Sequence, residues 1–186
     1  LVVIGRDAHG NKISVGGEPL QCTLTFHGTG ESEAVPMEDA GSGNYLFKHR
    51  FVRKGAYTLA MVDAAGEGAP GSPWALSVHP GPIDPRHALI TELAPAYVPG
   101  QQLAVLVETR DAFDNVVDRT SPYYSPEPFT GRLSNGSDVV VRESADGSGV
   151  FHVTHRLPDE PCQLKLYLTA PDGELVRNAG FPVSVH

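Results

Sequence analysis

The sequence predicts an all-β chain of two tandem β-sandwiches. Apolar residues recur at every second position in short runs, which is the pattern of strands with one buried face. One such face carries Leu20, Cys22, Leu24 and Phe26, and another carries Leu164, Leu166 and Leu168. The 186 residues include 20 Gly and 16 Pro, so turns are frequent, and no stretch has the apolar stripe of a helix.

The same motifs occur twice in the same order, which is the third observation behind this fold class. Arg6–Asn11 in the first half is matched by Arg110–Asn115 in the second, and each follows an apolar stretch. Gly41–Gly43 is likewise matched by Gly147–Gly149. Because the two copies lie roughly 105 residues apart, each has the length of one small β domain.

A proline-rich segment joins the two copies. Three prolines fall within residues 80–85, which predicts a short and fairly stiff connector. We therefore expect a first domain over residues 1–81 and a second, more divergent domain over residues 82–186.

Turn residues divide both domains into strands. In the first domain we expect strands at 1–7, 19–27, 32–38, 44–52, 55–63 and 72–79. In the second we expect strands at 87–94, 101–110, 128–134, 138–143, 149–157, 162–169 and 180–185. The first domain thus has no counterpart of the strand at 87–94, so we expect that its leading strand is missing or that the chain was cut from a longer one. An uncovered edge at Leu1–Asp7 would otherwise favour aggregation.

The net charge of the chain limits the kinds of molecule that we expect it to bind. The net charge is −8, which argues against a nucleic-acid binder, because phosphate contacts need clustered Lys and Arg. No apolar run approaches the roughly 20 residues of a membrane-spanning helix. We expect a protein partner, no insertion into a membrane, and a place within a longer multidomain chain.

Catalytic and metal-binding patterns are missing from the sequence. His152 and His155 lie three residues apart in an expected strand, so they point to opposite faces and cannot chelate one metal ion. The motifs of a nucleophile elbow, a phosphate-binding glycine loop and a zinc protease are also absent. We expect no enzymatic activity, no cofactor and no metal.

Two aspartates recur at equivalent positions of the repeat, Asp7 and Asp111. A carboxylate at such a place can accept hydrogen bonds from turn N–H groups and anchor the loop. Metal binding is the alternative for Asp111, but the central Gly and closing Glu of a calcium loop are absent. We therefore interpret both aspartates as structural.

Cysteine usage and one glycosylation sequence bear on the compartment. Cys22 and Cys162 fall on inward-facing positions of different domains, so we expect two buried free thiols. Such thiols suit the cytosol without excluding the cell exterior. Asn135-Gly136-Ser137 is an acceptor sequence for N-glycosylation at an expected turn, and Asn135 would carry a glycan only in a secreted protein.

Three segments together resemble filamin-type immunoglobulin-like repeats. They are Arg6–Asn11 with Gly16–Leu20, Gly43–Tyr45 with Gly55–Leu59, and Pro70–Val78 ending in Pro80-Gly81-Pro82. The resemblance covers nearly the whole chain and is weaker in the second domain. There, Asn178-Ala179-Gly180 replaces the Gly-Ser-Pro signature and Cys162 replaces a strand tyrosine.

The resemblance implies a docking module that a partner strand joins beside strand C, in a groove between strands C and D. Main-chain hydrogen bonds would then give affinity and alternate side chains selectivity. In this sequence the protein-binding residues would be Gln21, Thr23 and Thr25 from strand C with Ala34, Val35 and Met37 from strand D. An ordinary solvated sheet edge is the alternative interpretation.

Two functions from different classes follow from the resemblance. The first is an intracellular scaffold for the cytoskeleton or for signalling partners, with a cytoplasmic location. The alternative is an adhesion ectodomain on the extracellular face of the plasma membrane, for example in gamete attachment. A third interpretation is a spacer that binds nothing.

Overall fold

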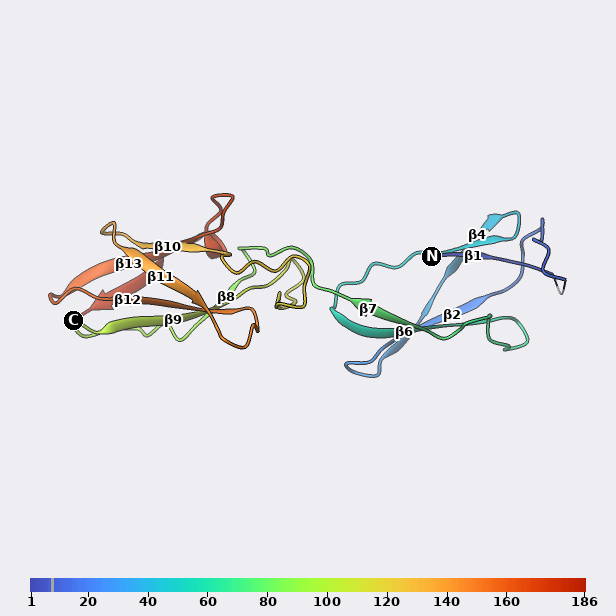
Figure 1. Cartoon of the computed structure of the whole chain (residues 1–186), viewed down its shortest axis with the longest axis horizontal. Helices are drawn as coiled ribbons and strands as arrows, with labels where there is room; N and C mark the ends of the chain where they lie inside the picture. The colour runs from blue at the N-terminus through green and yellow to red at the C-terminus, as the bar shows by residue number, and fades with distance from the viewer. Residues whose placement is uncertain (8) are drawn as a thin grey trace. The chain divides into compact units, whose positions relative to one another are not determined.

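The computed structural model describes residues 1–7 and 9–186 and contains two compact units (Figure 1). Ala8, inside the first copy of the repeated Arg6–Asn11 motif, lies outside the described residues. Unit 1 comprises Leu1–Val78 and unit 2 comprises His79–His186. The connector at 80–85 predicts a boundary at 81/82, and the division of the structure falls at 78/79.

Unit 1 is built from two antiparallel sheets. The strands of its larger sheet are, in spatial order, β3 (Ser32–Val35), β2 (Gln21–Phe26), β6 (Gly55–Val62) and β7 (Trp74–Val78). Those of the smaller sheet are β1 (Val2–Ile4), β5 (Asn44–Phe47) and β4 (Met37–Gly41). The buried faces of the two sheets enclose one core, formed by Cys22, Leu24, Val35, Phe47, Tyr57, Leu59 and Met61.

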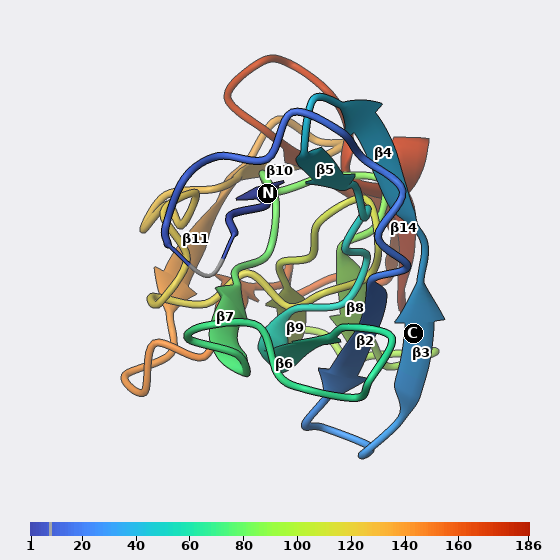
Figure 2. The same ribbon diagram turned by 90° about the vertical axis from the view of Figure 1, so that its right-hand side faces the viewer.

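The segment that we expected as one strand over 32–38 is two strands that belong to different sheets. Pro36 separates β3 from β4 and has no N–H to donate to a ladder. Before it, β3 pairs with β2, and after it, β4 pairs with β5. Figure 2 shows β3 and β4 as successive arrows, with β3 along the margin of the unit beside β2.

Unit 2 contains seven strands in one continuous hydrogen-bonded order. In that order they are β14 (Phe181–Val185), β13 (Cys162–Thr169), β10 (Thr130–Leu133), β11 (Asp138–Glu143), β12 (Val150–Arg156), β9 (Gln102–Glu108) and β8 (Leu89–Thr91). Strand β11 links the two halves, because its start pairs with β10 and its remainder with β12. One 3₁₀ turn, η1 (Val176–Asn178), is the helical element within the described residues.

The alternation seen in the sequence is confirmed by burial. In β13, Leu164, Leu166 and Leu168 are buried while Lys165 is exposed. The core of unit 2 joins these leucines to inward side chains of the other strands, including Leu103, Val105, Val107, Leu133, Val153, Val183 and Val185. The all-β prediction is therefore confirmed for both units.

The leading strand distinguishes the two units. In unit 2, β8 pairs with β9. In unit 1, the counterpart of β9 is β1, since each precedes a copy of the repeated Arg-Asp turn. Strand β1 pairs with β5, and within the described residues no strand covers its other edge. Val2 is 58% exposed and Ile4 48% exposed along this strand. Within the described residues, the edge of β1 thus lacks the neighbour that β8 gives β9 in unit 2.

The structural role predicted for Asp7 and Asp111 is confirmed. Asp7 Oδ1 accepts hydrogen bonds from the backbone N–H groups of His9 and Asn11 at 2.9 Å each. Asp111 Oδ1 accepts the corresponding bonds from Phe113 at 2.8 Å and Asn115 at 3.0 Å. Both repeats therefore close the same turn with the same carboxylate. Asp111 differs in being buried, and its Oδ2 also accepts the N–H of Gly81 at 2.8 Å.

Candidate functional site

The strand that we expected to receive a partner is already paired on both edges. Thr23 of β2 lies opposite Ala34 of β3 on one side and Ala60 of β6 on the other. The expectation of an open groove beside strand C is therefore wrong for this conformation. The physical reason is that the chain turns back after Phe26, and β3 covers the edge that strand C would offer.

The six predicted protein-binding residues fall into two groups. Gln21, Thr23, Thr25 and Ala34 have side chains on the outer face of the sheet, and Thr25 Oγ1 lies 2.8 Å from Ser32 Oγ. Val35 is 6% exposed within the core, and Met37 packs partly buried against that core. Val35 is therefore inaccessible to a partner. Whether the other residues bind a protein remains a prediction.

The open edge of this sheet belongs to β3. The N–H of Phe26 donates to the carbonyl of Glu31 at 2.8 Å, which makes this a hydrogen-bonded pair. Hydrogen-bonded pairs alternate in an antiparallel ladder, so Glu33 and Val35 also bond to β2. The backbone N–H and C=O groups of Ser32 and Ala34 consequently point outward, away from β2.

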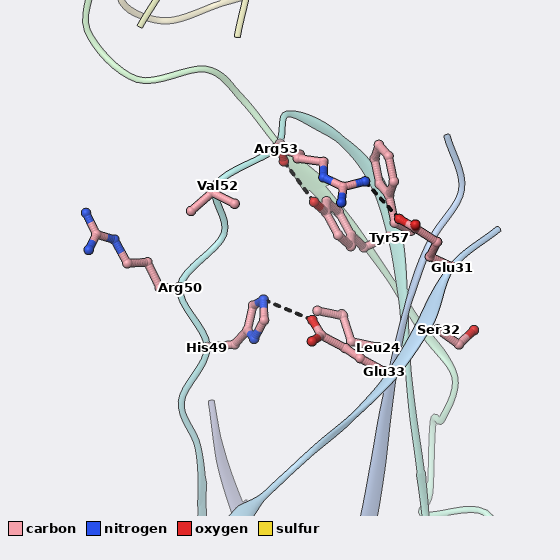
Figure 3. A pocket seen from close by; sticks show the side chains of 10 residues that line it. Leu24, Glu31, Ser32, Glu33, His49, Arg50, Val52, Arg53 and Tyr57 are labelled. Atoms are coloured by element: carbon pink, nitrogen blue, oxygen red, sulfur yellow. Dashed lines mark hydrogen bonds and ion pairs between the residues drawn. The ribbon is translucent and has the colours of Figure 1, made fainter. Parts of the chain in front are cut away.

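A groove of about 520 Å³ lies between β3 and the segment that joins β5 to β6 (Figure 3). Leu24, Phe26 and Tyr57 form part of its apolar lining, and the connecting segment contributes His49, Arg50, Val52 and Arg53. Because Glu31, Ser32 and Glu33 also line it, the groove runs beside the open edge. The connecting segment, residues 48–54, is called the lip below.

Aromatic rings hold the lip against the core. His49 lies edge-on to Phe51 at 4.7 Å between ring centroids, and Phe51 lies edge-on to Tyr57 at 5.0 Å. Tyr57 in turn packs on Phe26 at 4.9 Å. Such edge-to-face pairs each contribute about 0.5–1.5 kcal/mol beyond burial. The side chains at 49 and 51 therefore face inward and position the lip beside the groove.

Phe26 occupies space that only glycine neighbours leave open. A Cβ placed on Gly28 would lie 2.5 Å from Phe26 Cζ, and one on Gly55 would lie 2.8 Å from Phe26 Cε2. Gly55 also has a φ of 138°, a conformation that side chains rarely adopt. These two glycines let the ring settle at the end of the groove.

Arg53 ties the lip to both walls of the groove. Its guanidinium lies 5.6 Å from the centroid of the Phe26 ring, and its Nη1 donates to Glu31 Oε2 at 2.8 Å. Its carbonyl accepts the hydroxyl of Tyr57 at 2.9 Å. Burial raises the pKa of Tyr57, so this hydroxyl stays protonated as a donor. The Thr29 hydroxyl and then the Arg53 guanidinium lower the pKa of Glu31.

An imidazole of the lip faces a carboxylate of β3 across the groove. His49 Nε2 lies 3.5 Å from Glu33 Oε1, and Figure 3 shows the imidazole directed toward this carboxylate. Lys48 pairs with Glu38 at 2.5 Å on the adjoining strand β4. The Lys48–Glu38 pair is largely solvent-exposed, so it contributes roughly 0–1 kcal/mol.

The lip was not predicted from the sequence, although a composition signal marks it. Four of the 14 Lys and Arg residues fall within its seven positions: Lys48, Arg50, Arg53 and Lys54. In a chain of net charge −8 this is the densest basic stretch of unit 1. The contacts of Phe26 with Tyr57 and Arg53 join positions far apart in sequence, and no local pattern predicts them.

Comparisons with known proteins address the fold. No protein-family model and no curated protein sequence matches this chain. Among solved structures, the Escherichia coli adhesin FdeC is similar at 19% identity and a TM-score of 0.59, over 100% of this chain and 58% of that one. Invasin, a bacterial integrin-binding protein, is similar at 12% identity and a TM-score of 0.54, over 97% of this chain and 34% of that one.

Both units are immunoglobulin-like β-sandwiches. A Lin-41 filamin domain is also similar, at 14% identity and a TM-score of 0.42, over 57% of this chain and 98% of that one. At their identities, the similarity to FdeC and invasin concerns the fold alone. The chain spans about a third to three fifths of the length of the FdeC and invasin structures.

The remaining sequence-predicted positions lie apart from the groove. Asn135 is exposed in the turn between β10 and β11 of the second immunoglobulin-like unit, and its Oδ1 accepts the N–H of Ser137 at 3.1 Å. His152 Nε2 lies 3.1 Å from Ser144 Oγ on the surface of the same unit. Cys22 is a buried free thiol and Cys162 a half-buried one.

The described residues contain neither a cluster of metal-ligating side chains nor a membrane-spanning helix. Among residues 1–7 and 9–186, no three His, Cys, Asp or Glu side chains gather as a metal site would require. Within that same range, no helix has the length and apolarity needed to cross a membrane.

Proposed function

We propose that this chain is a non-enzymatic protein-binding module of the adhesion type, displayed on the extracellular face of a cell as part of a longer protein. The observation that carries the proposal is the open edge of β3 beside the groove, at Ser32 and Ala34. The similarity of nearly the whole chain to stretches of the adhesin FdeC and of invasin supports the extracellular setting.

A relationship to filamin-type repeats is part of the same proposal. The support lies in the repeated Arg6–Asn11 and Arg110–Asn115 turns, which share a carboxylate anchor. Filamin-type repeats would receive a partner beside strand C, which is β2 in this chain. Because β3 covers β2, the proposed partner site lies on the open edge of β3. A partner strand would pair with β3 instead of β2.

Strand addition at β3 has a defined chemistry. Main-chain hydrogen bonds to Ser32 and Ala34 would give affinity, and alternate side chains of the partner would face the groove. Those side chains would lie beside Glu31 and Glu33 of β3, so basic or apolar residues suit these positions, whereas like charges directly opposite destabilise a sheet. Pro36 ends the available edge, because it has no N–H.

Substitution of Ala34 tests the proposal. The N–H of Ala34 points outward, so Ala34→Pro removes a donor from the open edge without removing a bond to β2. Ala34→Val is the matched control, since it keeps the N–H and favours a strand. Beads coated with residues 1–186 are expected to bind cells or purified cell-surface and matrix proteins. Ala34→Pro should abolish this binding and Ala34→Val should preserve it.

Two results would contradict the proposal. Undiminished binding by a folded Ala34→Pro chain would exclude strand addition at β3. A lack of adhesion by the wild-type chain and both variants, at the level of uncoated beads, would exclude the adhesion role.

An intracellular scaffold is the second candidate. The observation in its favour is that Cys22 and Cys162 are both free thiols, as is usual in a reducing compartment. A glycan found at Asn135 of the natural protein would decide for the cell exterior, because N-glycosylation occurs on the secretory route. A cytoplasmic location of the complete protein would decide for the scaffold.

A further inference from the structure

A segment of unit 2, residues 88–97, covers the edges of two strands and is called the strap below. Its first part, β8, pairs antiparallel with β9, and its end pairs in parallel with β14 through Tyr97 and Val185. The N–H of Tyr97 donates to the carbonyl of Ser184 at 2.8 Å, and the N–H of His186 donates to the carbonyl of Tyr97 at 3.0 Å. The strap therefore satisfies backbone groups on both edges.

Side chains of the strap also complete the core of unit 2. Ala88 is fully buried and Tyr97 is 5% exposed, while Ile90 and Leu93 pack partly buried against the same core. The hydroxyl of Tyr97 accepts the N–H of Ala94 at 3.1 Å, which fixes the end of the strap. Main-chain bonds and apolar packing thus act together to hold the strap in place.

The edge of β1 in unit 1 is open where the strap covers β9 in unit 2. The N–H of Gly5 donates to the carbonyl of Gly43 at 2.7 Å, which makes this a hydrogen-bonded pair beside β1 and β5. Such pairs alternate along an antiparallel ladder, so the backbone groups of Val2 and Ile4 point away from β5. No strand among residues 1–7 and 9–186 pairs with them there.

The edge of β7 is open in the same way. The N–H of His27 donates to the carbonyl of Ala56 at 3.0 Å, so the backbone of Ala56 faces β2. Ser77 of β7 lies opposite Ala56, and its own N–H and C=O therefore point outward. Ser77 is the fourth residue of β7, as Ser184 is the fourth of β14, where the strap binds. In the described part of unit 1, β6 is the one strand that pairs with β7.

Burial differs between the two units on the strands that the strap joins. In unit 2 the inward positions of these strands are at most 1% exposed: they are Val107, Val183 and Val185. Their counterparts in unit 1 pack against the core but are only half-buried: they are Val3, Leu76 and Val78. A peptide laid over both edges of unit 1 would remove further apolar surface from water, which favours its addition.

We propose that unit 1 docks an extended peptide of the strap's type, supplied from outside this chain's two units, along the open edges of β1 and β7. The peptide would run antiparallel to β1 and bond to Val2 and Ile4, and it would run parallel to β7 and bond to Ser77. An apolar residue would occupy the place of Ile90, and an aromatic residue that of Tyr97. The site is separate from the open edge of β3, so this inference goes beyond the proposed function.

A second copy of the chain suits these edges less well than such a peptide. Strand β1 has three residues, so two copies joined along β1 would bury far less than the roughly 1,200 Å² of a stable interface. The strap of another copy is already bound to its own unit 2. A separate peptide can instead reach both edges and both sets of half-buried side chains.

A synthetic peptide of residues 86–98 is the probe, added to the chain of residues 1–186. It should bind saturably and change the fluorescence of Trp74, which begins β7. At saturation, the backbone amides of Val2, Ile4 and Ser77 should exchange hydrogen more slowly than in the chain alone, because the peptide then bonds to these edges.

Two peptide variants provide a matched comparison that leaves the chain unchanged. Ile90→Lys puts a charge where the strap packs against the core, so it should weaken binding at least about tenfold. Thr91→Lys adds the same charge at an exposed position of the strap. It should change the affinity by less than about twofold.

Four results would overturn the proposal. One is the absence of saturable binding, or of protection at Val2, Ile4 and Ser77. Protection of Ser32 and Ala34 instead would assign the peptide to β3. Equal affinities of the two peptide variants would exclude an apolar contact. A doubled mass of the chain alone in sedimentation, with Val2 and Ile4 already protected, would assign the edge to a second copy. The Ala34→Pro adhesion test is independent of all four, so failure here is distinguishable from failure of the proposed function.

Discussion

Replacing Asp111 by Asn tests how a buried carboxylate anchors the repeated turn. Asp111 is 2% exposed and accepts backbone N–H bonds from Gly81, Phe113 and Asn115, together with the Asn115 side-chain amide at 2.9 Å. An Asn of the same shape can still accept bonds through one oxygen. Its NH₂ group would face the N–H of Gly81, so one buried donor loses its acceptor.

The expected loss follows from these contacts. A buried donor without a partner costs about 1–3 kcal/mol, and the remaining bonds weaken because the acceptor is no longer charged. We therefore expect Asp111→Asn to lower the free energy of unfolding of unit 2 by about 3 kcal/mol. For a unit of this size that corresponds to a fall in Tm of about 12 °C.

The assay can follow the two units separately. The chain has one tryptophan, Trp74, which packs against the core of unit 1, so its fluorescence reports that unit alone. Far-UV circular dichroism reports both units. Asp111→Asn should shift the part of the circular dichroism transition that belongs to unit 2 and leave the Trp74 transition in place. Asp7→Asn is the matched control in the exposed copy of the turn and should move the Trp74 transition much less.

Lowering the pH should reveal how much the Asp111 carboxylate contributes to the stability of unit 2. Burial acts to raise the pKa of Asp111, but the hydrogen bonds from Asn115, Gly81 and Phe113 outweigh it and lower the pKa below its usual 3.8. The carboxylate therefore stabilises unit 2 fully above about pH 5, and this contribution is lost as the pH falls through the lowered pKa. The gap between wild type and Asp111→Asn should narrow in that acid range. A constant gap from pH 7 to pH 2, or a loss below about 1 kcal/mol at pH 7, would refute the reasoning.

Two further perturbations probe unit 1 and the thiols. Tyr57→Phe removes the hydrogen bond to the carbonyl of Arg53 and should lower the free energy of unfolding of unit 1 by about 1 kcal/mol. Urea unfolding followed by Trp74 fluorescence measures this loss. No change in the free energy of unfolding would mean that the ring contacts alone hold the lip. Cys22 is 3% exposed and burial raises its pKa. A thiol reagent should therefore modify Cys162 first and Cys22 only on unfolding. Equal rates of modification for the two cysteines would contradict the burial of Cys22 in the core.

Local pattern was sufficient to predict most strands and the turn anchors. Alternation over Leu164–Leu168 identifies β13 because both its faces are defined by residues within the strand itself. The repeated Asp7 and Asp111 predict their own hydrogen bonds, because the donors lie two and four residues further on. Both features depend on residues that lie close together in the sequence, so the sequence alone predicts them.

The sequence did not predict which strands pair with each other. Thr23 and Thr25 have the composition of an edge strand, yet β3 covers them, because a turn after Phe26 brings Ser32–Val35 alongside. The pairing of a strand is decided by long-range register and by competition between neighbours, which alternation does not specify. The groove was missed for a similar reason. Its rings come from positions 26, 49, 51 and 57, which only the folded chain brings together.

The central claim is that β3 has an open edge that accepts a partner strand. Amide hydrogen exchange along β3 tests this claim most directly. In the isolated chain, Glu33 and Val35 should exchange slowly because they bond to β2, and Ser32 and Ala34 should exchange fast. Addition of a blocked peptide with alternating Thr and Lys, which suits the positions beside Glu31 and Glu33, should protect Ser32 and Ala34. Protection of Ser32 and Ala34 before any peptide is added, or their continued fast exchange at saturating peptide, would contradict the account.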